Sequence, residues 1–456
     1  MIRPSFVLLL ALVLVLGLPC LPGAQSSADA SPVHWPSFRG VRASGVSTGG
    51  EIPAKWNVET GENIGWRTDI AGLGLSSPII WGDKLFVTTA VAEAGRAKLE
   101  AGLYGRIAAA DDDGPQSWRL ICLDKKTGRI LWDRELHRGK PTIKRHTKAS
   151  HANSTPATDG KCVVSFLGSE GLHCVDLDGK LLWKKTFGTL DSGYFRVKTA
   201  QWGFASSPTI YAGRVIVQCD VQGQSFLASL DIKTGDEMWR TRRDEIPTWS
   251  TPAIIDAPGG TQIALNGFRH TGGYDFATGK QVWNLQGGGD IPVPTPISAH
   301  GLTFITSAHG RLSPIYAIHQ TATGEISATE KDAKDFAWKI SRGGNYMQTP
   351  IVVGDLLFAC KDQGIMSCFD ARGGERHFQE RLSRERTGFG FTASPVSDGK
   401  KIVYVSEDGY GFVMSADKEF KRIAKNKIGS ACLASPAISE GKLFIRTRGQ
   451  IVCVGR

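Results

Sequence analysis

Eight of the ten Ser-Pro or Thr-Pro dipeptides in the chain recur mostly at intervals of about 45 residues, and this repeat constrains the fold more than any other feature. They are Ser77-Pro78, Thr155-Pro156, Ser207-Pro208, Thr251-Pro252, Thr295-Pro296, Thr349-Pro350, Ser394-Pro395 and Ser435-Pro436. Self-similarity at such a period is typical of architectures in which each repeat buries its apolar face only against its neighbours. The chain is therefore predicted to fold as a ring or array of about eight units.

Each repeat has the pattern of a meander of short strands. Most dipeptides are followed by a turn, such as that at Gly82 and Asp83, and then by an apolar strand such as residues 84–89 (KLFVTT). A second glycine turn and a third strand follow. Glycine takes the positive φ that tight hairpins need, and the flanking residues favour strands. The pattern predicts the four-stranded antiparallel blades of a β-propeller.

The repeat ends on its most specific motif, Asp-x-x-Thr-Gly-x-x-x-Trp. Full copies end at Trp132, Trp239 and Trp283, and a shortened copy ends at Trp183. We expect the aspartate to accept hydrogen bonds from turn amides and the indole to pack between neighbouring blades. Stacking of these tryptophans on a cofactor is the alternative, which their periodic placement disfavours.

The repeat count predicts how the ring closes. The eighth repeat, from Ser435 to Arg456, lacks a fourth strand, whereas residues 63–70 (NIGWRTDI) look like a fourth strand with Trp66 in the tryptophan position. Pairing of the two chain ends would remove an open sheet edge. The predicted fold is all-β, an eight-bladed β-propeller over residues 63–456 closed by the N-terminal strand. Seven blades are the alternative if one degenerate repeat is not a blade.

The N-terminus predicts export. Residues 1–24 combine a short basic start with an apolar run too short to cross a bilayer, so they are interpreted as a cleaved signal peptide whose cleavage position stays open. Cys20 follows Pro19, a poor match to a lipoprotein signal, so no lipid anchor is predicted. We expect a periplasmic or secreted monomer without a transmembrane helix, in which residues 25–62 form an opening segment before the propeller.

The charge distribution argues against nucleic-acid binding. The net charge is +10 over 456 residues, and the basic residues are scattered, often at presumed hairpin tips such as Lys125 and Lys126 or Lys400 and Lys401. A basic stripe with interleaved aromatic residues, which nucleic-acid binding needs, is not found in the sequence.

One insertion, residues 92–116, interrupts the first repeat. It is rich in Ala, Gly and Asp, and its spacing is compatible with one short helix. Long loops on rigid scaffolds often carry function, although many are only decorations. Asp111, Asp112 and Asp113 lack the alternating spacing of a calcium loop, so a solvated turn is favoured and no metal site is predicted.

Three segments carry a family resemblance: residues 35–40 (WPSFRG) with GVS after them, residues 154–161 (STPATDGK), and the run from Thr392 to Thr447. With these, the chain resembles the quinoprotein alcohol dehydrogenase-like propellers, in particular secreted bacterial PQQ-like repeat propellers. It is more distantly similar to the propeller lipoprotein that assists outer-membrane protein assembly. The resemblance covers nearly everything after the signal. It is a strong indication of the fold but a weak indication of the function, because blades of this type occur both in dehydrogenases and in non-catalytic proteins.

The resemblance implies a definite chemistry if the chain is an enzyme. A quinone-dependent dehydrogenase holds calcium-bound PQQ in its central funnel, with an aspartate or histidine base and cationic groups at the quinone oxygens. The disulfide between adjacent cysteines of the alcohol-oxidising members has no counterpart, and no C-x-x-C-H haem motif is present. Sugar-oxidising members lack that disulfide too, so the enzyme hypothesis stays open. No catalytic residue, cofactor or metal is predicted, and PQQ and calcium belong to the alternative only.

Cysteines recur with the repeat. One third-strand position is occupied in four blades by Cys122, Cys174, Cys368 and Cys453, as is typical of a small buried hydrophobe. Disulfides joining Cys162 to Cys174 and Cys360 to Cys368 across hairpins are an alternative with demanding geometry.

A ligand site is expected at the mouth of the central channel, near the start of each innermost strand. The candidates are Trp202, Trp249, Arg269 and Asn345, and blade-top packing is the competing interpretation of each. The histidines, His309 among them, are expected to be surface or core residues. The first functional hypothesis is a non-catalytic binding or scaffold propeller of the cell envelope that holds a protein, peptide or glycan at its rim or channel. The alternative is a PQQ-dependent alcohol or sugar dehydrogenase.

Overall fold

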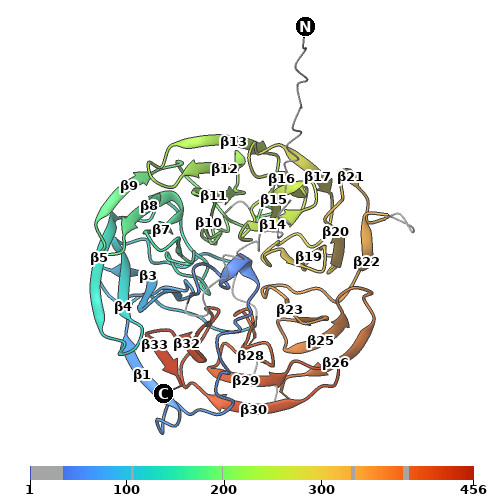
Figure 1. The fold of residues 1–456 in the computed structure, drawn as a ribbon. Helices are drawn as coiled ribbons and strands as arrows, with labels where there is room; N and C mark the ends of the chain where they lie inside the picture. Colours follow the sequence, from blue (N-terminus) through green and yellow to red (C-terminus); the bar gives the residue numbers. More distant parts are fainter. Residues whose placement is uncertain (2–33, 104–106, 198, 330–333, 384–389, 456) are drawn as a thin grey trace. The chain divides into compact units, whose positions relative to one another are not determined.

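The repeats fold into antiparallel sheets that follow one another around a common centre (Figure 1). The strands of the described residues form eight sheets, so the propeller has the eight blades that the dipeptide count predicts rather than seven. Each blade begins at its Ser-Pro or Thr-Pro dipeptide near the centre, and its fourth strand lies at the outer rim.

The structure is a computed structural model that describes residue 1 and residues 34–103, 107–197, 199–329, 334–383 and 390–455. The chain divides into two units, Met1–Ala30 and Ser31–Arg456. The predicted signal peptide and Cys20 lie outside the described residues, apart from Met1. A search of the described helices finds none with the length and apolar character needed to cross a bilayer.

The first four blades take their strands in sequence order from the inside outwards. They are β2 (Ile79–Trp81), β3 (Lys84–Ala92), β4 (Gln116–Asp124) and β5 (Ile130–Gly139); β6 (Ala157–Thr158), β7 (Cys162–Phe166), β8 (Leu172–Asp176) and β9 (Leu181–Lys185); β10 (Thr209–Tyr211), β11 (Arg214–Cys219), β12 (Ser225–Asp231) and β13 (Glu237–Arg243); and β14 (Ala253–Ala257), β15 (Gly260–Leu265), β16 (Thr271–Asp275) and β17 (Gln281–Leu285). The fourth blade gains a parallel fifth strand, β21 (Gly324–Ile326), from the degenerate repeat that follows.

The next three blades have the same order, and the eighth takes its fourth strand, β1 (Ile64–Asp69), from the N-terminal end of the chain. These four blades are β18 (Ile297–Ala299), β19 (Leu302–Thr306), β20 (Ile315–His319) and β22 (Phe336–Ile340); β23 (Ile351–Val353), β24 (Leu356–Cys360), β25 (Ile365–Asp370) and β26 (Arg376–Arg381); β27 (Val396–Ser397), β28 (Lys401–Val405), β29 (Tyr410–Ser415) and β30 (Arg422–Lys427); and β31 (Ala437–Ser439), β32 (Lys442–Arg446), β33 (Gln450–Val454) and β1. Two short 3-10 helices are described, η1 (Val41–Ala43) and η2 (Gly168–Glu170).

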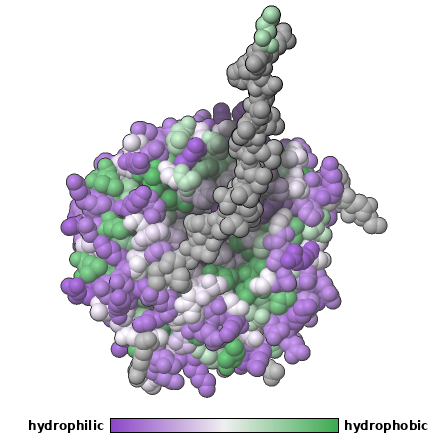
Figure 2. Space-filling model, viewed as in Figure 1, coloured by the Kyte–Doolittle hydropathy of each residue, from purple (hydrophilic) through white to green (hydrophobic). Residues whose placement is uncertain are grey.

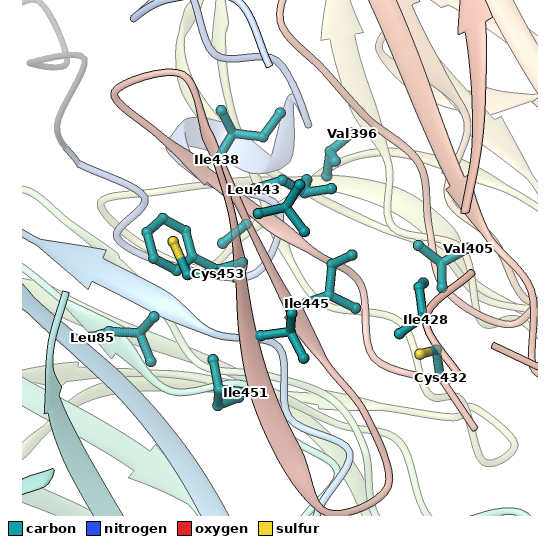
Figure 3. Close-up of a cluster of buried hydrophobic side chains, with 14 of the residues drawn as sticks. Leu85, Val396, Val405, Ile428, Cys432, Ile438, Leu443, Ile445, Ile451 and Cys453 are labelled. Atoms are coloured by element: carbon teal, nitrogen blue, oxygen red, sulfur yellow. The ribbon is translucent and has the colours of Figure 1, made fainter. Parts of the chain in front are cut away.

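The ring closes between the two ends of the chain, as predicted. Strand β1 pairs antiparallel with β33, and Trp66 lies opposite Cys453. Figure 3 shows the apolar core that continues across this closure, with Leu85 of the first blade, Leu443 and Ile451 of the eighth blade, and further residues of the seventh. The closing blade is therefore packed on both sides like the other blades.

The repeat tryptophans are inter-blade packing residues, which confirms the prediction. The indole of Trp66 donates to the carbonyl oxygen of Lys125 in the neighbouring blade at 3.0 Å, and that of Trp183 donates to the carbonyl oxygen of Ile232 at 2.8 Å. Gly128 of the Thr-Gly turn has φ +74°, and a Cβ on it would lie 2.4 Å from the Trp66 ring. The turn therefore needs glycine both for its conformation and for the space that the indole occupies.

The third-strand residue opposite the aromatic residue of the fourth strand is small in most blades. The pairs are Cys122 and Trp132, Cys174 and Trp183, Ser229 and Trp239, Gly273 and Trp283, Ala317 and Trp338, Cys368 and Phe378, and Cys453 and Trp66. This register explains the recurring cysteines, which are buried and act as small apolar residues as predicted. All eight described cysteines are free thiols, including both pairs considered for disulfides. Burial raises the pKa of Cys453 to about 11, so this thiol stays protonated at neutral pH.

The outer surface is mainly polar. Figure 2 shows hydrophilic residues over most of the visible outer surface of the blades, with small hydrophobic patches between them. Large exposed apolar side chains lie on the outermost strands of four blades at Ile130, Leu181, Leu182, Met238 and Ile423, and Leu312 is exposed in the loop between β19 and β20. The rim therefore has the solvated character expected from the scattered charges.

The insertion between β3 and β4 corrects two expectations. Its described residues contain turns and an isolated bridge between Ala109 and His146, and the helix that the spacing allowed is not formed in them. Asp112 is not part of a solvated turn, because its carboxylate forms an ion pair with the buried guanidinium of Arg145. Asp111 and Asp113 lie at the surface within 4 Å of the Lys144 ammonium.

Candidate binding site

A cavity of about 410 Å³ lies at the centre of the ring, where the innermost strands begin. All eight repeat hydroxyls line it, together with residues of the segments that precede each dipeptide. The hydroxyl residues are Ser77, Thr155, Ser207, Thr251, Thr295, Thr349, Ser394 and Ser435. The repeat that defines the fold therefore also forms the wall of the cavity.

Hydrogen bonds from backbone amides to side-chain hydroxyls link these residues from blade to blade. Seven of the eight amides donate to the hydroxyl of the next residue, in the pairs Ser77 and Thr155, Thr155 and Ser207, Ser207 and Thr251, Thr251 and Thr295, Thr295 and Thr349, Thr349 and Ser394, and Ser394 and Ser435, over 2.9–3.3 Å. Each hydroxyl still has its own proton to donate. The proline that follows each of these residues has no N–H. Each blade therefore brings one backbone donor fewer to the cavity wall that would need a hydrogen-bond partner. This hydroxyl ring explains why the dipeptides recur.

Aromatic side chains form one wall of the cavity. The ring of Tyr194 stacks on Trp202 with 5.3 Å between centroids and 3° between planes, and Trp202 lies 5.6 Å from Trp249. The Trp202 indole donates to the carbonyl oxygen of Ile107, and that of Trp249 donates to the carbonyl oxygen of Gly203, both at 3.0 Å. Both indole N–H groups are therefore occupied, and these hydrogen bonds fix the two rings at the cavity wall.

A histidine held by a carboxylate lies beside this wall. His309 lines the cavity, and its Nδ1 is 2.5 Å from Oδ1 of the buried Asp290. The other carboxylate oxygen of Asp290 accepts from Nε of Arg196 at 3.1 Å and from the hydroxyl of Tyr194 at 3.4 Å. Burial and the Asp290 charge raise the pKa of Tyr194, so the phenol remains a donor. His309 has φ +80°, a conformation uncommon outside glycine that marks a strained position.

The insertion and a buried ion pair complete the mouth. Leu103 and Ile107 of the insertion line the cavity, as does Lys148. The Lys148 ammonium lies 2.8 Å from Oε1 of the buried Glu407, whose Oε2 accepts from the amide of Gly102 at 2.8 Å. The charge of this lysine is therefore matched within the protein.

The opening segment crosses the opposite end of the channel. It bonds to the far ends of innermost strands in three blades, with Pro36 accepting from the amide of Thr158, Arg42 pairing with Asp256, and the Ser47 amide donating to Ser397. Figure 1 draws η1 of this segment, in blue, over the centre of the ring. Residues 34–47 therefore close this end of the channel.

Arg39 anchors the opening segment in the middle of the channel. Its side chain is fully buried, with Nη1 donating to the carbonyl oxygen of Pro350 at 2.7 Å and Nη2 to that of Pro395 at 3.4 Å. Burial lowers the pKa of Arg39 to about 9, which leaves the guanidinium charged at neutral pH. The adjacent Phe38 lines the cavity, so the opening segment supplies its floor.

The structure brings together two of the four residues nominated from the sequence. Trp202 and Trp249 line the cavity. Arg269 lies away from the lining and pairs with Asp244 at the surface, and Asn345 is fully buried with its amide donating to the carbonyl oxygen of Gln348. Both were nominated from their place before a strand, which does not fix the direction of a side chain.

Sequence reasoning missed Tyr194, Asp290 and His309. They come from the segments before two different blades and from a hairpin, so no spacing in the chain links them. The one available signal was their position near the dipeptides Ser207-Pro208 and Thr295-Pro296.

Comparison with known proteins agrees with this architecture. Over 343 residues the chain is 22% identical to the outer membrane protein assembly factor BamB of Burkholderia pseudomallei, a match that covers 72% of this chain and 76% of that protein. Among solved structures it is similar to a europium-containing methanol dehydrogenase (TM-score 0.57, 13% identity, 92% of this chain and 91% of that one). It is also similar to the quinohemoprotein alcohol dehydrogenase of Comamonas testosteroni (TM-score 0.60, 12% identity, 94% and 82%). At these identities the likeness to both dehydrogenases concerns the fold alone.

A family model covers most of the propeller. The model described as outer membrane protein assembly factor BamB matches residues 117–338 and 328–427, which is more than half of the chain. The chain therefore belongs to this family of PQQ-repeat propellers.

Proposed function

We propose that this chain is a non-catalytic binding propeller of the cell envelope and that its central cavity is the binding site. The observation that carries the proposal is the fixed aromatic wall of Trp202 and Trp249 beside the carboxylate-held His309. Rigid aromatic faces with a few convergent polar groups are typical of ligand sites. The family relative named as an outer membrane assembly factor supports a binding role and an envelope location.

The rim is the less favoured location for a partner. Its exposed apolar side chains are scattered, whereas the cavity gathers aromatic, aliphatic and polar groups around one enclosed volume. A ligand in the cavity would be surrounded by several blades, which buries much more of its surface than a single blade edge can.

The described lining does not fit PQQ. This quinone carries three carboxylates, yet Lys148 is the single lysine or arginine among the described lining residues and its charge is matched by Glu407. The calcium that accompanies PQQ requires several oxygen ligands. In the part of the chain that the structure describes, no group of three or more His, Cys, Asp or Glu side chains could hold a metal ion. The dehydrogenase alternative therefore gains no support from this site.

A reconstitution experiment separates the two hypotheses. The purified protein is incubated with PQQ and calcium, desalted, and tested for quinone absorbance and for dye-linked oxidation of ethanol and glucose. We expect neither retained quinone nor oxidation. Retained quinone together with oxidation of either substrate would overturn the non-catalytic role.

A crosslinking experiment tests the location of the site. A benzoylphenylalanine replaces Ile107 at the cavity mouth or, as the control, Ile423 on β30 at the rim, since both side chains are exposed and apolar. We expect adducts in the native envelope from position 107 and none from position 423. Adducts from position 423 alone would place binding at the rim and contradict the proposal.

A further inference from the structure

We infer that the ligand of the central cavity is a neutral saccharide, bound with a sugar ring against the faces of Trp202 and Trp249. This inference rests on the proposed function, because it assumes that the cavity binds a ligand. It follows from three properties of the described lining: rigid aromatic faces, many neutral hydrogen-bonding groups, and charges that are matched within the protein.

The aromatic wall offers faces rather than polar edges. The indole N–H groups of Trp202 and Trp249 are both used by backbone carbonyl oxygens. Tyr194 stacks on Trp202 and supports it from one side. A pyranose ring presents C–H groups on one face and hydroxyls around its edge. Such a ring gains apolar contact from an aromatic face while its hydroxyls stay free to hydrogen-bond elsewhere.

The hydroxyl ring suits the edge of a sugar. The eight serine and threonine residues of the repeat dipeptides line one cavity, and a hydroxyl can both donate and accept hydrogen bonds. A flat apolar ligand offers the protons of these hydroxyls no acceptor, and leaving a buried donor without a partner is unfavourable. A polyhydroxylated ligand replaces the water with equivalent partners.

His309 adds a directed polar group. Asp290 holds its Nδ1, so Nε2 is the ring atom left to meet a ligand. The φ of +80° is unfavourable for histidine, and strain of this kind persists where the surrounding structure fixes a residue for a role. A sugar hydroxyl can donate to Nε2 or accept from it.

Charge argues against an anionic ligand. Lys148 is matched by Glu407, and the Asp290 carboxylate is engaged by His309, Arg196 and Tyr194. Among the described lining residues there is thus no cation left to balance a carboxylate or phosphate. Burying an unbalanced charge in such a cavity would be costly, whereas a neutral saccharide avoids this cost.

Calorimetric titration of the full chain tests the inference. The probes are cellotriose and chitotriose as neutral saccharides, and 2-naphthoate as a flat aromatic anion. The variants are Trp249→Leu, which removes one aromatic face, and His309→Asn, which removes the imidazole but tolerates positive φ. Trp81→Leu is the matched control, because Trp81 stacks on His34 at the start of the opening segment and neither residue is part of the cavity lining.

We expect at least one trisaccharide to bind, with affinity about tenfold weaker in both cavity variants and unchanged in Trp81→Leu. Thermal midpoints verify that each variant is folded. If Trp249→Leu is unstable, the affinity of His309→Asn alone is compared with that of the control. Absence of trisaccharide binding, or binding that is equal in all variants, overturns the inference. Binding of 2-naphthoate alone, lost in the cavity variants, would also overturn it while leaving the cavity as a binding site. Failure of the proposed function is recognised separately by the reconstitution and crosslinking results.

Discussion

At the scale of single residues, burial without a charged partner is a recurring feature of this propeller. Arg39 and Arg446 are buried, and they donate hydrogen bonds to carbonyl and hydroxyl oxygens of neighbouring blades. Burial lowers the pKa of Arg446 to about 9, as it does for Arg39. A guanidinium tolerates such a site because its fixed fork of donors can serve several carbonyl groups at once. These arginines join blades at the channel, where a shorter side chain would leave carbonyl oxygens unsatisfied.

His173 on β8 provides a prediction about pH. It is buried, and burial lowers its pKa to about 4. The folded pKa lies below the unfolded value of about 6.5, so the stability it contributes is complete above about pH 6.5 and is lost as the pH falls through about 4. Measured by urea unfolding, His173→Gln should reduce the loss of unfolding free energy between about pH 7 and about pH 4 by about 3 kcal/mol.

The control for this prediction is His319→Gln, which changes a partly exposed histidine at the end of β20. It should keep the pH dependence of the unmodified protein. If His173→Gln keeps that dependence as well, His173 is not the group responsible.

At the scale of elements, the insertion between β3 and β4 is held to the cavity mouth by contacts from several blades. Arg145 binds Asp112 and the carbonyl oxygen of Lys98, and Arg448 of the last blade donates to the carbonyl oxygen of Ala97 at 2.8 Å. The loop therefore has a defined path despite its lack of regular secondary structure in the described residues. Its anchors are mostly backbone groups, which explains why side-chain periodicity did not predict its conformation.

Glu407 provides a prediction for this element. Its carboxylate accepts from the Gly102 amide at 2.8 Å, from Lys148, and from the hydroxyl of Thr392 at 2.6 Å. Glu407→Gln replaces charge-assisted hydrogen bonds by weaker ones, each worth about 1.5–3 kcal/mol before the change. Trypsin should therefore cut after Arg96 or Lys98 about tenfold faster, as measured by mass spectrometry of a digestion time course.

The matched control is Glu59→Gln, which weakens a surface ion pair with Lys427 outside the insertion. It should leave cleavage of the insertion unchanged. Equal cleavage rates in Glu407→Gln and the unmodified protein would show that Glu407 does not hold the loop.

At the scale of the whole molecule, the closure between β1 and β33 decides whether the ring has an open edge. At five of the eight junctions between blades, a tryptophan of the fourth strand packs on a turn glycine of the next blade. At the closure this tryptophan is Trp66, which lies on β1 at the N-terminal end of the chain, while the other strands of its blade come from the C-terminal end. An open β33 would expose unpaired backbone groups and invite association with other chains.

Paired substitutions of Trp66 and Trp183 test the closure. Both indoles have the same small exposure, donate to a backbone carbonyl oxygen of the next blade and cover a turn glycine. Each change to Ala should destabilise the fold by about 3–5 kcal/mol. Trp66→Ala should in addition speed hydrogen exchange in residues 450–455, measured by mass spectrometry, because β1 is joined to that blade by non-covalent contacts alone. Equal exchange there in the two variants would argue against this role of the closure.

The sequence by itself determined the blade, the blade count and the closure, because each depends on local patterns that repeat: a dipeptide, a glycine turn and a tryptophan at fixed spacing. It also located Trp202 and Trp249 at the channel mouth, since they precede repeat dipeptides. The tertiary structure alone decided that the opening segment closes one end of the channel around Arg39. It alone joined Asp290, His309 and Tyr194 beside the aromatic wall. Those contacts form between residues far apart in the chain, and ring closure fixes them rather than any periodicity along the chain.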